Sequence, residues 1–288
     1  MHLPLESALK SNWEFHLVYG VVCGLCLIGI MTGILFAAKQ LKFGAISWRE
    51  RAGFLRHIPL SETPALLLIA GIFLAHIILI GVAGRVPRIV DSEWGIVTSS
   101  LAMHWFIVVF VLVWKRSARF SWKDAFGFER KRMVAHTLRG LVAYLIAIPV
   151  IFVVTFLYRI VLLRFGYPIE EQQPIVDFLT GNIPIHTRIY GIILAVCVAP
   201  VAEELLFRGI LLPLMTRITG VATAIIVTSL LFAGMHLFIP AIATLFFVSL
   251  TCSFAYIYTG SLTTPITFHA IFNAINLVIF FALKGSSA

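Results

Sequence analysis

Eight long apolar runs dominate the sequence and limit the folds that it can adopt. Each run holds 18–24 residues, close to the roughly 20 apolar residues with which a helix crosses the hydrocarbon core of a bilayer. A backbone at that depth must satisfy its own hydrogen bonds, and runs without apolar–polar alternation favour helices over a closed barrel. We therefore predict an all-α, polytopic membrane protein with about eight transmembrane helices, at residues 17–38, 65–84, 95–114, 140–163, 189–212, 220–238, 241–258 and 265–283.

The amino-acid composition excludes a water-soluble protein of this size. Hydrophobic residues make up 60% of the 288 residues and charged residues 12%, against about 45–50% and about 25% in soluble domains. No soluble segment, internal repeat or low-complexity tract interrupts the apolar runs. We therefore expect a single membrane domain over residues 1–288.

The basic residues lie mainly in the short connections between apolar runs. The chain carries 22 Lys and Arg against 13 Asp and Glu. Cytoplasmic connections of membrane proteins are enriched in Lys and Arg, so we expect the connections 39–64 and 115–139, with five and eight basic residues, to face the cytoplasm. The distribution of charge thus indicates how the chain is oriented in a cell membrane. We expect the lipid bilayer to be its partner and expect no nucleic acid to bind. Aromatic residues interleave with basic ones from Phe120 to Phe128, which predicts a helix lying on the inner leaflet.

Charged side chains are rare in the last hundred residues, and three of the five lie in one segment, at Glu203, Glu204 and Arg208. An ionisable group at mid-membrane costs about 2.5–3.5 kcal/mol on insertion scales. Glu204 and Arg208 are four residues apart, the better orientation for an ion pair on a helix. Glu203 is rotated about 100° from Glu204 on a helix, so we expect it to point elsewhere and to accept protons. A purely architectural clasp is the alternative.

Two later apolar runs carry a histidine with a partner at helical spacing. His236 follows a phenylalanine by four residues, and His269 precedes Asn273 by four, which places the members of each pair on one helix face. His76 and His104 lie in other apolar runs without a polar neighbour at that spacing, so they are expected to be ordinary interior histidines. A polar set on three apolar helices predicts a functional, water-filled cavity.

Simple alternation of the last three runs would place His236 and His269 far apart across the bilayer. A single site requires that the run 220–238 stops at mid-depth, before Pro240, or that a connection dips into the protein. Irregular backbone is tolerated at that depth where it lines a water-filled cavity. We therefore predict a recessed, water-accessible funnel.

Three motifs in this order, E-E-x-x-x-R, F-x-x-x-H and H-x-x-x-N, resemble those of the CPBP (Abi/CPBP) family, which includes the type II CAAX prenyl endopeptidases. They are intact here at Glu203–Arg208, Phe232–His236 and His269–Asn273. The resemblance is closest over residues 203–273 and implies a CAAX-protease-like core at about 140–283. It implies an intramembrane endopeptidase that hydrolyses a peptide bond of a membrane-associated protein or peptide.

The resemblance also implies a role for each matching residue. Glu203 corresponds to the family's catalytic glutamate, which activates a water molecule, and His236 to the histidine that assists this glutamate or orients the water. His269 and Asn273 correspond to the pair that stabilises the oxyanion. These residue types suit peptide hydrolysis, which needs a base and donors aimed at the developing negative charge. Supporting positions of the family are matched by two further residues, Glu204 and Arg208.

A metal-dependent mechanism is the main alternative. Family members were long described as metalloproteases, and two histidines with one glutamate form a known zinc set, here His236, His269 and Glu203. The chain contains no H-E-x-x-H motif, and Asn273 is a poor zinc ligand but a good oxyanion donor. We therefore favour a glutamate-type mechanism without a cofactor over a zinc metalloendopeptidase.

Two functions of other classes also remain open. One is a non-catalytic membrane immunity or assembly factor, in which the same residues hold a ligand or stabilise the fold. The other is a proton-coupled transporter, because buried carboxylates and histidines also form proton relays.

Overall fold

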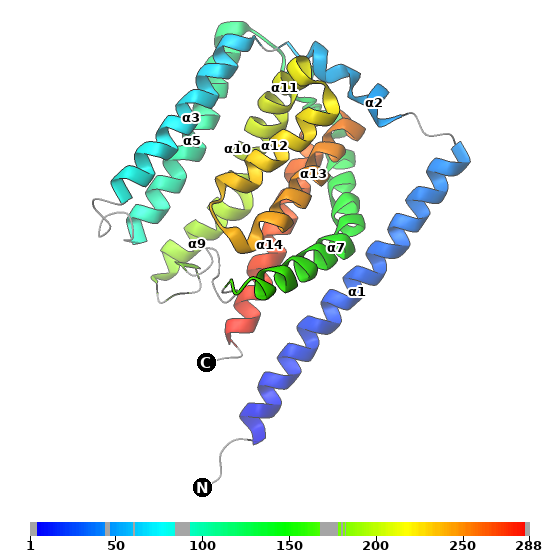
Figure 1. The fold of residues 1–288 in the computed structure, drawn as a ribbon, viewed down its shortest axis with the longest axis vertical. Coiled ribbons are helices and arrows are strands. Elements are labelled where there is room, and N and C mark those ends of the chain that lie inside the picture. Colours follow the sequence, from blue (N-terminus) through cyan, green and yellow to red (C-terminus); the bar gives the residue numbers. More distant parts are fainter. Residues whose placement is uncertain are drawn as a thin grey trace.

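The computed structural model is all-helical over the residues that it describes, which are 5–43, 47–59, 61–83, 93–167, 178–179, 181 and 183–285 (Figure 1). Within this part of the chain, five helical segments are long and apolar enough to cross a bilayer: Gly20–Lys39, Arg130–Arg164, Ile185–Thr219, Ile239–Thr259 and Thr263–Ala282. The protein is therefore an all-α, multi-pass membrane protein.

Each of the eight apolar runs falls on a helix or on a continuous helical segment, so the predicted helix positions are confirmed. The predicted count of eight crossings goes beyond the five segments above. The helices are α1 (Leu5–Phe43), α3 (Glu62–Ala83), α5 (Glu93–Ala118), α7 (Met133–Arg164), the segment from α9 to α11 (Ile185–Thr219), α12 (Val221–Met235), α13 (Ile242–Thr259) and α14 (Thr263–Gly285).

The helices surround the short segment α10 (Ala199–Glu204), which carries both adjacent glutamates. α10 contacts α5 and α14. α3 and α5 lie side by side at one edge of the molecule, and α1 contacts α7 at the opposite edge (Figure 1). The two glutamates therefore lie inside the bundle, between an early helix and the last one.

The helical segment Ile185–Thr219 changes from α-helical to the wider π-helical geometry directly before and directly after α10. Two π-helical stretches, η3 (Leu194–Val198) and η4 (Leu205–Leu211), flank α10. A proline lies shortly after each stretch, at Pro200 and Pro213. Proline lacks the N–H that an α-helix needs and clashes with the carbonyl four residues earlier, and a π-bulge is one way in which a helix absorbs such a break.

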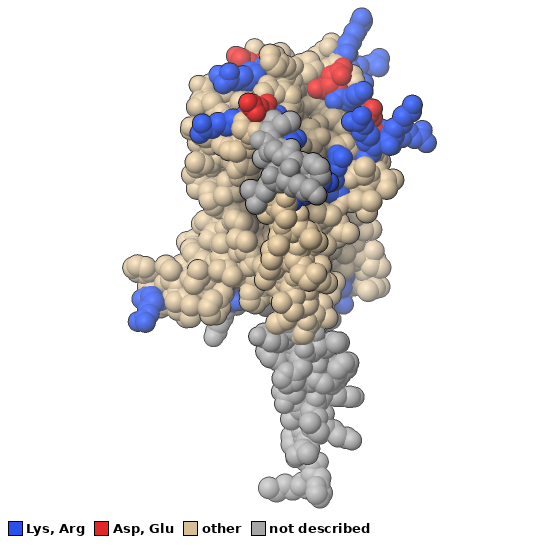
Figure 2. Space-filling model, turned by 90° about the vertical axis from the view of Figure 1, so that its right-hand side faces the viewer, with Lys and Arg blue, Asp and Glu red and all other residues tan. Residues whose placement is uncertain are grey.

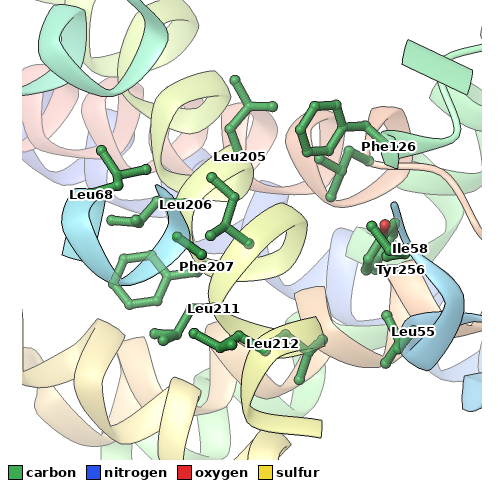
Figure 3. Close-up of a cluster of buried hydrophobic side chains, with 14 of the residues drawn as sticks. Leu55, Ile58, Leu68, Phe126, Leu205, Leu206, Phe207, Leu211, Leu212 and Tyr256 are labelled. Carbon is green, nitrogen blue, oxygen red and sulfur yellow. The ribbon is translucent and has the colours of Figure 1, made fainter. Parts of the chain in front are cut away.

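Apolar side chains hold η4 on all sides (Figure 3). Apart from Arg208, its residues other than glycine are apolar and face several directions at once, as expected of a buried helix. They meet Leu55 of η1 (Ala52–His57), Leu68 of α3 and Phe126 of α6 (Trp122–Phe126) in one core. The core residues contributed by η4 and the residue after it are between 0% and 6% exposed: Leu205, Leu206, Phe207, Ile210, Leu211 and Leu212. This packing fixes the position of the glutamates just before η4.

α12 is too short to cross the hydrocarbon core alone. Its 15 residues span about 22 Å at 1.5 Å per residue, against roughly 30 Å of hydrocarbon. The helix ends at Met235, and Leu237 adopts a left-handed φ of 49°. The short helix η5 (Ile239–Ala241) follows. The helix therefore ends before Pro240, in the first of the two arrangements that a single site requires, whereas its end at mid-depth of a membrane stays a prediction.

The two basic connections lie at the same end of the molecule, where Lys and Arg side chains gather (Figure 2). Both reach the turn between α13 and α14. The Arg51 guanidinium lies 4.5 Å from the ring centroid of Tyr258, and the backbone N–H of Leu262 donates to the carbonyl of Phe126 over 2.9 Å. This placement agrees with the expectation that both connections share one side of the membrane.

The aromatic side chains of the second basic connection pack into the protein. α6 has only five residues, and Phe120 and Phe126 are 6% and 0% exposed. Phe126 lies so close to Gly209 that a Cβ there would stand 2.8 Å from its ring. The predicted inner-leaflet helix is therefore wrong for Phe120 and Phe126, which stabilise the core beside η4 instead of facing lipid. For Trp122 and Phe128, which are half-buried, it stays a prediction.

Candidate active site

Glu203 lies at the centre of a group of histidines from three other helices. Its Oε1 is 3.2 Å from Nε2 of His104 on α5, and its Oε2 is 3.8 Å from Nε2 of His269 on α14. It also interacts electrostatically with His236, at the end of α12. The side chain is 16% exposed, whereas Oε2 itself is buried and has no hydrogen-bond partner among the described residues. Oε1 thus has a hydrogen-bond partner, whereas Oε2 has none among the described residues.

Glu204 forms a buried clasp with residues of α13 and α14. Its Oε1 accepts hydrogen bonds from Nη1 of Arg208 over 2.9 Å and from Nδ1 of His269 over 3.0 Å. Nη2 of Arg208 donates to both the carbonyl and the hydroxyl oxygen of Ser249, each over 2.7 Å. Glu204 and Arg208 are 0% and 1% exposed. The predicted ion pair between Glu204 and Arg208 is therefore confirmed, and so is the separation of the two carboxylates.

The hydrogen bonds fix which ring nitrogen of two histidines carries a proton. Nδ1 of His269 donates to the Glu204 carboxylate, and Nδ1 of His236 donates to the carbonyl of Phe232 over 2.8 Å. In the neutral imidazole the other nitrogen then has a lone pair. His269 therefore directs Nε2 at Glu203, and Nε2 of His236 is available to accept a hydrogen bond.

Phe232 is the apolar centre around which these polar groups are arranged. Its ring centroid lies 4.9 Å from that of His236 and 5.6 Å from that of His269. The Arg208 guanidinium lies 5.1 Å from the same ring, a favourable cation–π distance. The structure therefore brings both predicted histidines to one place, around the ring of Phe232.

Asn273 binds the backbone of the widened helix rather than another side chain. Its Nδ2 donates to the carbonyl of Ala195 over 2.8 Å. The backbone N–H of Ala199 donates to Leu194, five residues back, so the next donor in this register would be residue 200, a proline without an N–H. Asn273 thus supplies the hydrogen bond that Pro200 cannot give.

Replacing Asn273 with aspartate is expected to lower the free energy of unfolding by about 1–3 kcal/mol, the cost of an unsatisfied buried polar group. Aspartate has nearly the same shape but no N–H for the Ala195 carbonyl. The control is Asn276→Asp, because Nδ2 of Asn276 donates only to Phe272 in its own helix. Thermal unfolding in detergent measures both. Equal losses of unfolding free energy in the two variants would contradict a stabilising role of the hydrogen bond from Asn273 to Ala195.

Sequence reasoning missed His104. We expected it, like His76, to be an ordinary interior histidine, but it is 6% exposed and contacts Glu203. That expectation is wrong because spacing within one helix carries no information about a contact between helices. The side chain of His76 lies outside the described residues.

A small cavity beside η4 does not correspond to the predicted funnel, which stays a prediction. It has a volume of about 10 Å³ and is lined only by apolar side chains of α3, η4 and α12, such as Ile72, Phe207 and Met235. A space of this size just accommodates one water, but it needs polar partners to do so. None of the polar residues of the site lines it.

The donor groups of the site do not fit a zinc ion as they stand. In the described part of the chain, no three His, Cys, Asp or Glu side chains are grouped so that they could hold a metal. Glu203, His236 and His269 are the right donor types for zinc, but they do not form such a group in the described residues. The zinc-dependent alternative therefore has no support from this arrangement.

The part of the chain that carries the site resembles a known protease family. Residues 185–275, from the start of α9 (Ile185–Ile193) into α14, match the family model described as type II CAAX prenyl endopeptidase Rce1-like. Searches of the curated proteins and of the solved structures found no match. The match contains the three motifs, including Glu203, His236 and Asn273. Residues 185–275 are therefore a domain of the Rce1-like type II CAAX prenyl endopeptidase (CPBP) family.

Proposed function

We propose that the protein is an intramembrane endopeptidase that hydrolyses a peptide bond of a membrane-associated protein or peptide. The observation that carries this proposal is the Glu203 carboxylate, held by imidazoles within an otherwise apolar bundle. An ionisable group in such a place is expensive and is usually functional. The family match points to the same class of reaction.

Glu203 is the general base of the proposed reaction. Its Oε2 takes a proton from a water molecule while the water oxygen forms a bond to the carbonyl carbon of the substrate, and the carbonyl electron pair moves onto its oxygen. When this tetrahedral intermediate collapses, the C–N bond breaks and the leaving nitrogen takes the proton from Glu203. His236 assists by accepting a hydrogen bond from the water at Nε2, since its Nδ1 proton is bonded to Phe232.

His269 and Asn273 stabilise the oxyanion in this proposal. In this step His269 acts as an imidazolium whose Nδ1–H donates to the Glu204 carboxylate. The imidazolium carries a second proton on Nε2, which donates to the negative oxygen. Asn273 has a second hydrogen on Nδ2 besides the one bonded to Ala195. Donors of this kind typically contribute about 10²–10³-fold to kcat.

Glu204 and Arg208 support these groups. Arg208 balances the charge of Glu204, and Ser249 fixes the guanidinium from α13. The pair thereby orients His269 without contacting the substrate.

The proposed membrane arrangement has eight crossings in one domain over residues 1–288, with the protease-like core at about 140–283. α3 and α5 add two crossings beyond the five long apolar segments. The third consists of α12 together with the non-helical residues 236–238, because α12 alone is too short. The protein lies in the cell membrane with both basic connections in the cytoplasm.

Mass spectrometry of membrane peptides tests the reaction without knowledge of the substrate. Cells with the protein are expected to contain matching pairs of new N-terminal and C-terminal fragments that cells without it lack. The purified protein should then cleave a synthetic peptide that spans the bond so identified. Identical peptide maps from both cell types would contradict the protease proposal.

Metal dependence is measured in the same assay. We expect thorough chelation to leave cleavage unchanged, because Glu203 and the imidazoles perform each step themselves. Loss of cleavage on chelation, with recovery on addition of zinc, would overturn the metal-free mechanism.

A non-catalytic membrane immunity or assembly factor is the second candidate. It is favoured by one observation, namely that Glu204 and Arg208 form a fully buried ion pair that joins α13 and α14, as an architectural role requires. Under this alternative the clasp of Glu204 and Arg208 would be architectural, and Glu203→Gln would preserve the cellular phenotype. A protease loses its phenotype with the same variant.

A further inference from the structure

His104 comes from a part of the chain that the family match does not include. It lies on α5, 99 residues before Glu203 and outside residues 185–275. Even so, its Nε2 is 3.2 Å from Oε1 of Glu203, closer than Nε2 of His269, which is 3.8 Å from Oε2. The side chain is buried, with 6% of its surface exposed. A histidine of an early helix thus contacts the carboxylate of the family's glutamate motif.

The contact distinguishes the two oxygens of the Glu203 carboxylate. Nε2–H of His104 donates to Oε1, since a carboxylate only accepts. A buried carboxylate needs such donors, because without them its charge is poorly solvated. Oε2 has no hydrogen-bond partner among the described residues and faces His269. Holding Oε1 on α5 therefore fixes the orientation in which Oε2 meets the histidine of α14.

We infer that His104 is a positioning residue for Glu203, so that α5 forms part of the active site together with the Rce1-like domain. Because Glu203 acts as a base only in the proposed hydrolysis, this role rests on the proposed function. His104 keeps its proton throughout, does not touch the substrate, and acts by keeping the carboxylate ionised and oriented. Orientation of a catalytic group matters steeply, since a small misplacement can cost about a hundredfold in rate.

Two substitutions separate this role from simple packing. His104→Leu removes the donor and keeps a similar volume, whereas His104→Gln keeps an N–H near the position of Nε2. With an internally quenched farnesylated CAAX peptide as the probe, His104→Leu is expected to lower kcat about 10- to 100-fold, the effect of losing a hydrogen bond to a charged group, with KM within about twofold. His104→Gln should recover most of kcat.

The packing control is Ile107→Ala, a residue of the same helix that is 1% exposed. It loses buried contacts on α5 without changing a donor to Glu203, so its kcat should equal that of the unmodified protein. Unchanged kcat in His104→Leu, or equal losses in His104→Leu and His104→Gln, would overturn the positioning role.

Thermal unfolding in detergent tests the contact independently of cleavage. His104→Leu is expected to lower Tm in the unmodified background, but to have little effect when Glu203→Leu has already removed the carboxylate, because interacting residues are not additive. Equal Tm shifts in both backgrounds would overturn the inference. If the Tm shifts are non-additive but the unmodified protein cleaves neither the probe nor any membrane peptide, the proposed function fails, whereas the contact between His104 and Glu203 is supported.

Discussion

Replacing Glu203 with glutamine is expected to lower kcat for peptide hydrolysis by about 1,000-fold, within the about 10²–10⁴-fold that a general base contributes. Glutamine has the same shape and still offers a carbonyl oxygen to Nε2 of His104, which is 3.2 Å away from Oε1. It cannot take a proton from water. KM should change little, because the substrate is bound by other parts of the protein. Initial rates of the purified variant on a cleaved peptide measure the effect.

The control for this variant is Glu62→Gln, the same chemical change at an exposed residue at the start of α3. Its kcat should equal that of the unmodified protein. The Tm of Glu203→Gln should also fall little, since the side chain keeps its volume and its acceptor. If Glu203→Gln cleaves at the unmodified rate, Glu203 is not the base and the proposed mechanism fails.

The sequence was sufficient to predict the helices and the internal pairing of the glutamate motif. Apolar runs of membrane length place the helices because lipid leaves the backbone few choices. The pair Glu204 and Arg208 followed from spacing alone, since residues four apart share a helix face, and the observed distance of 2.9 Å agrees. Such local rules succeed where both partners lie on one helix.

The predictions that the structure contradicts concern contacts between segments far apart in the sequence. His104 and Glu203 are 99 residues apart, and no spacing rule relates α5 to α10. The aromatic residues near Phe126 looked suited to a membrane surface, yet they fill the space beside Gly209. In each case the packing of one helix on another decided the position of the side chain.

The partner of Asn273 was partly visible in the sequence. Pro200 lies within an apolar run, and a proline inside a helix leaves an earlier carbonyl without its donor. A buried carbonyl of this kind needs another partner. An amide side chain on a neighbouring helix is a suitable one, and Asn273 supplies it to Ala195. Only the structure shows which carbonyl is affected, because the π-helical register moves it by one residue.

Replacing Arg208 with methionine is expected to lower the free energy of unfolding by about 3–5 kcal/mol, the cost of leaving one member of a buried ion pair without its partner. Glu204 would lose the guanidinium that balances its charge, while His269 would still donate to it, and Ser249 would lose two hydrogen bonds. Methionine keeps an unbranched side chain of similar length, so the loss of charge and donors dominates. Unfolding in detergent and the yield of folded protein measure the loss.

The double variant Glu204→Gln with Arg208→Met distinguishes the cost of an unpaired carboxylate from the cost of lost packing around Arg208. Removing both charges takes away the uncompensated carboxylate, so the double variant should be more stable than Arg208→Met alone. His269 would then lack the carboxylate to which its Nδ1 donates, so kcat should stay low although part of the stability is recovered. The stability of Arg208→Lys should lie between those of the unmodified protein and Arg208→Met, because one ammonium does not reproduce the forked guanidinium that joins Glu204 to Ser249. If the double variant is less stable than Arg208→Met by the full cost of a second independent loss, the two residues do not act as a clasp, and His269 must be oriented by other contacts.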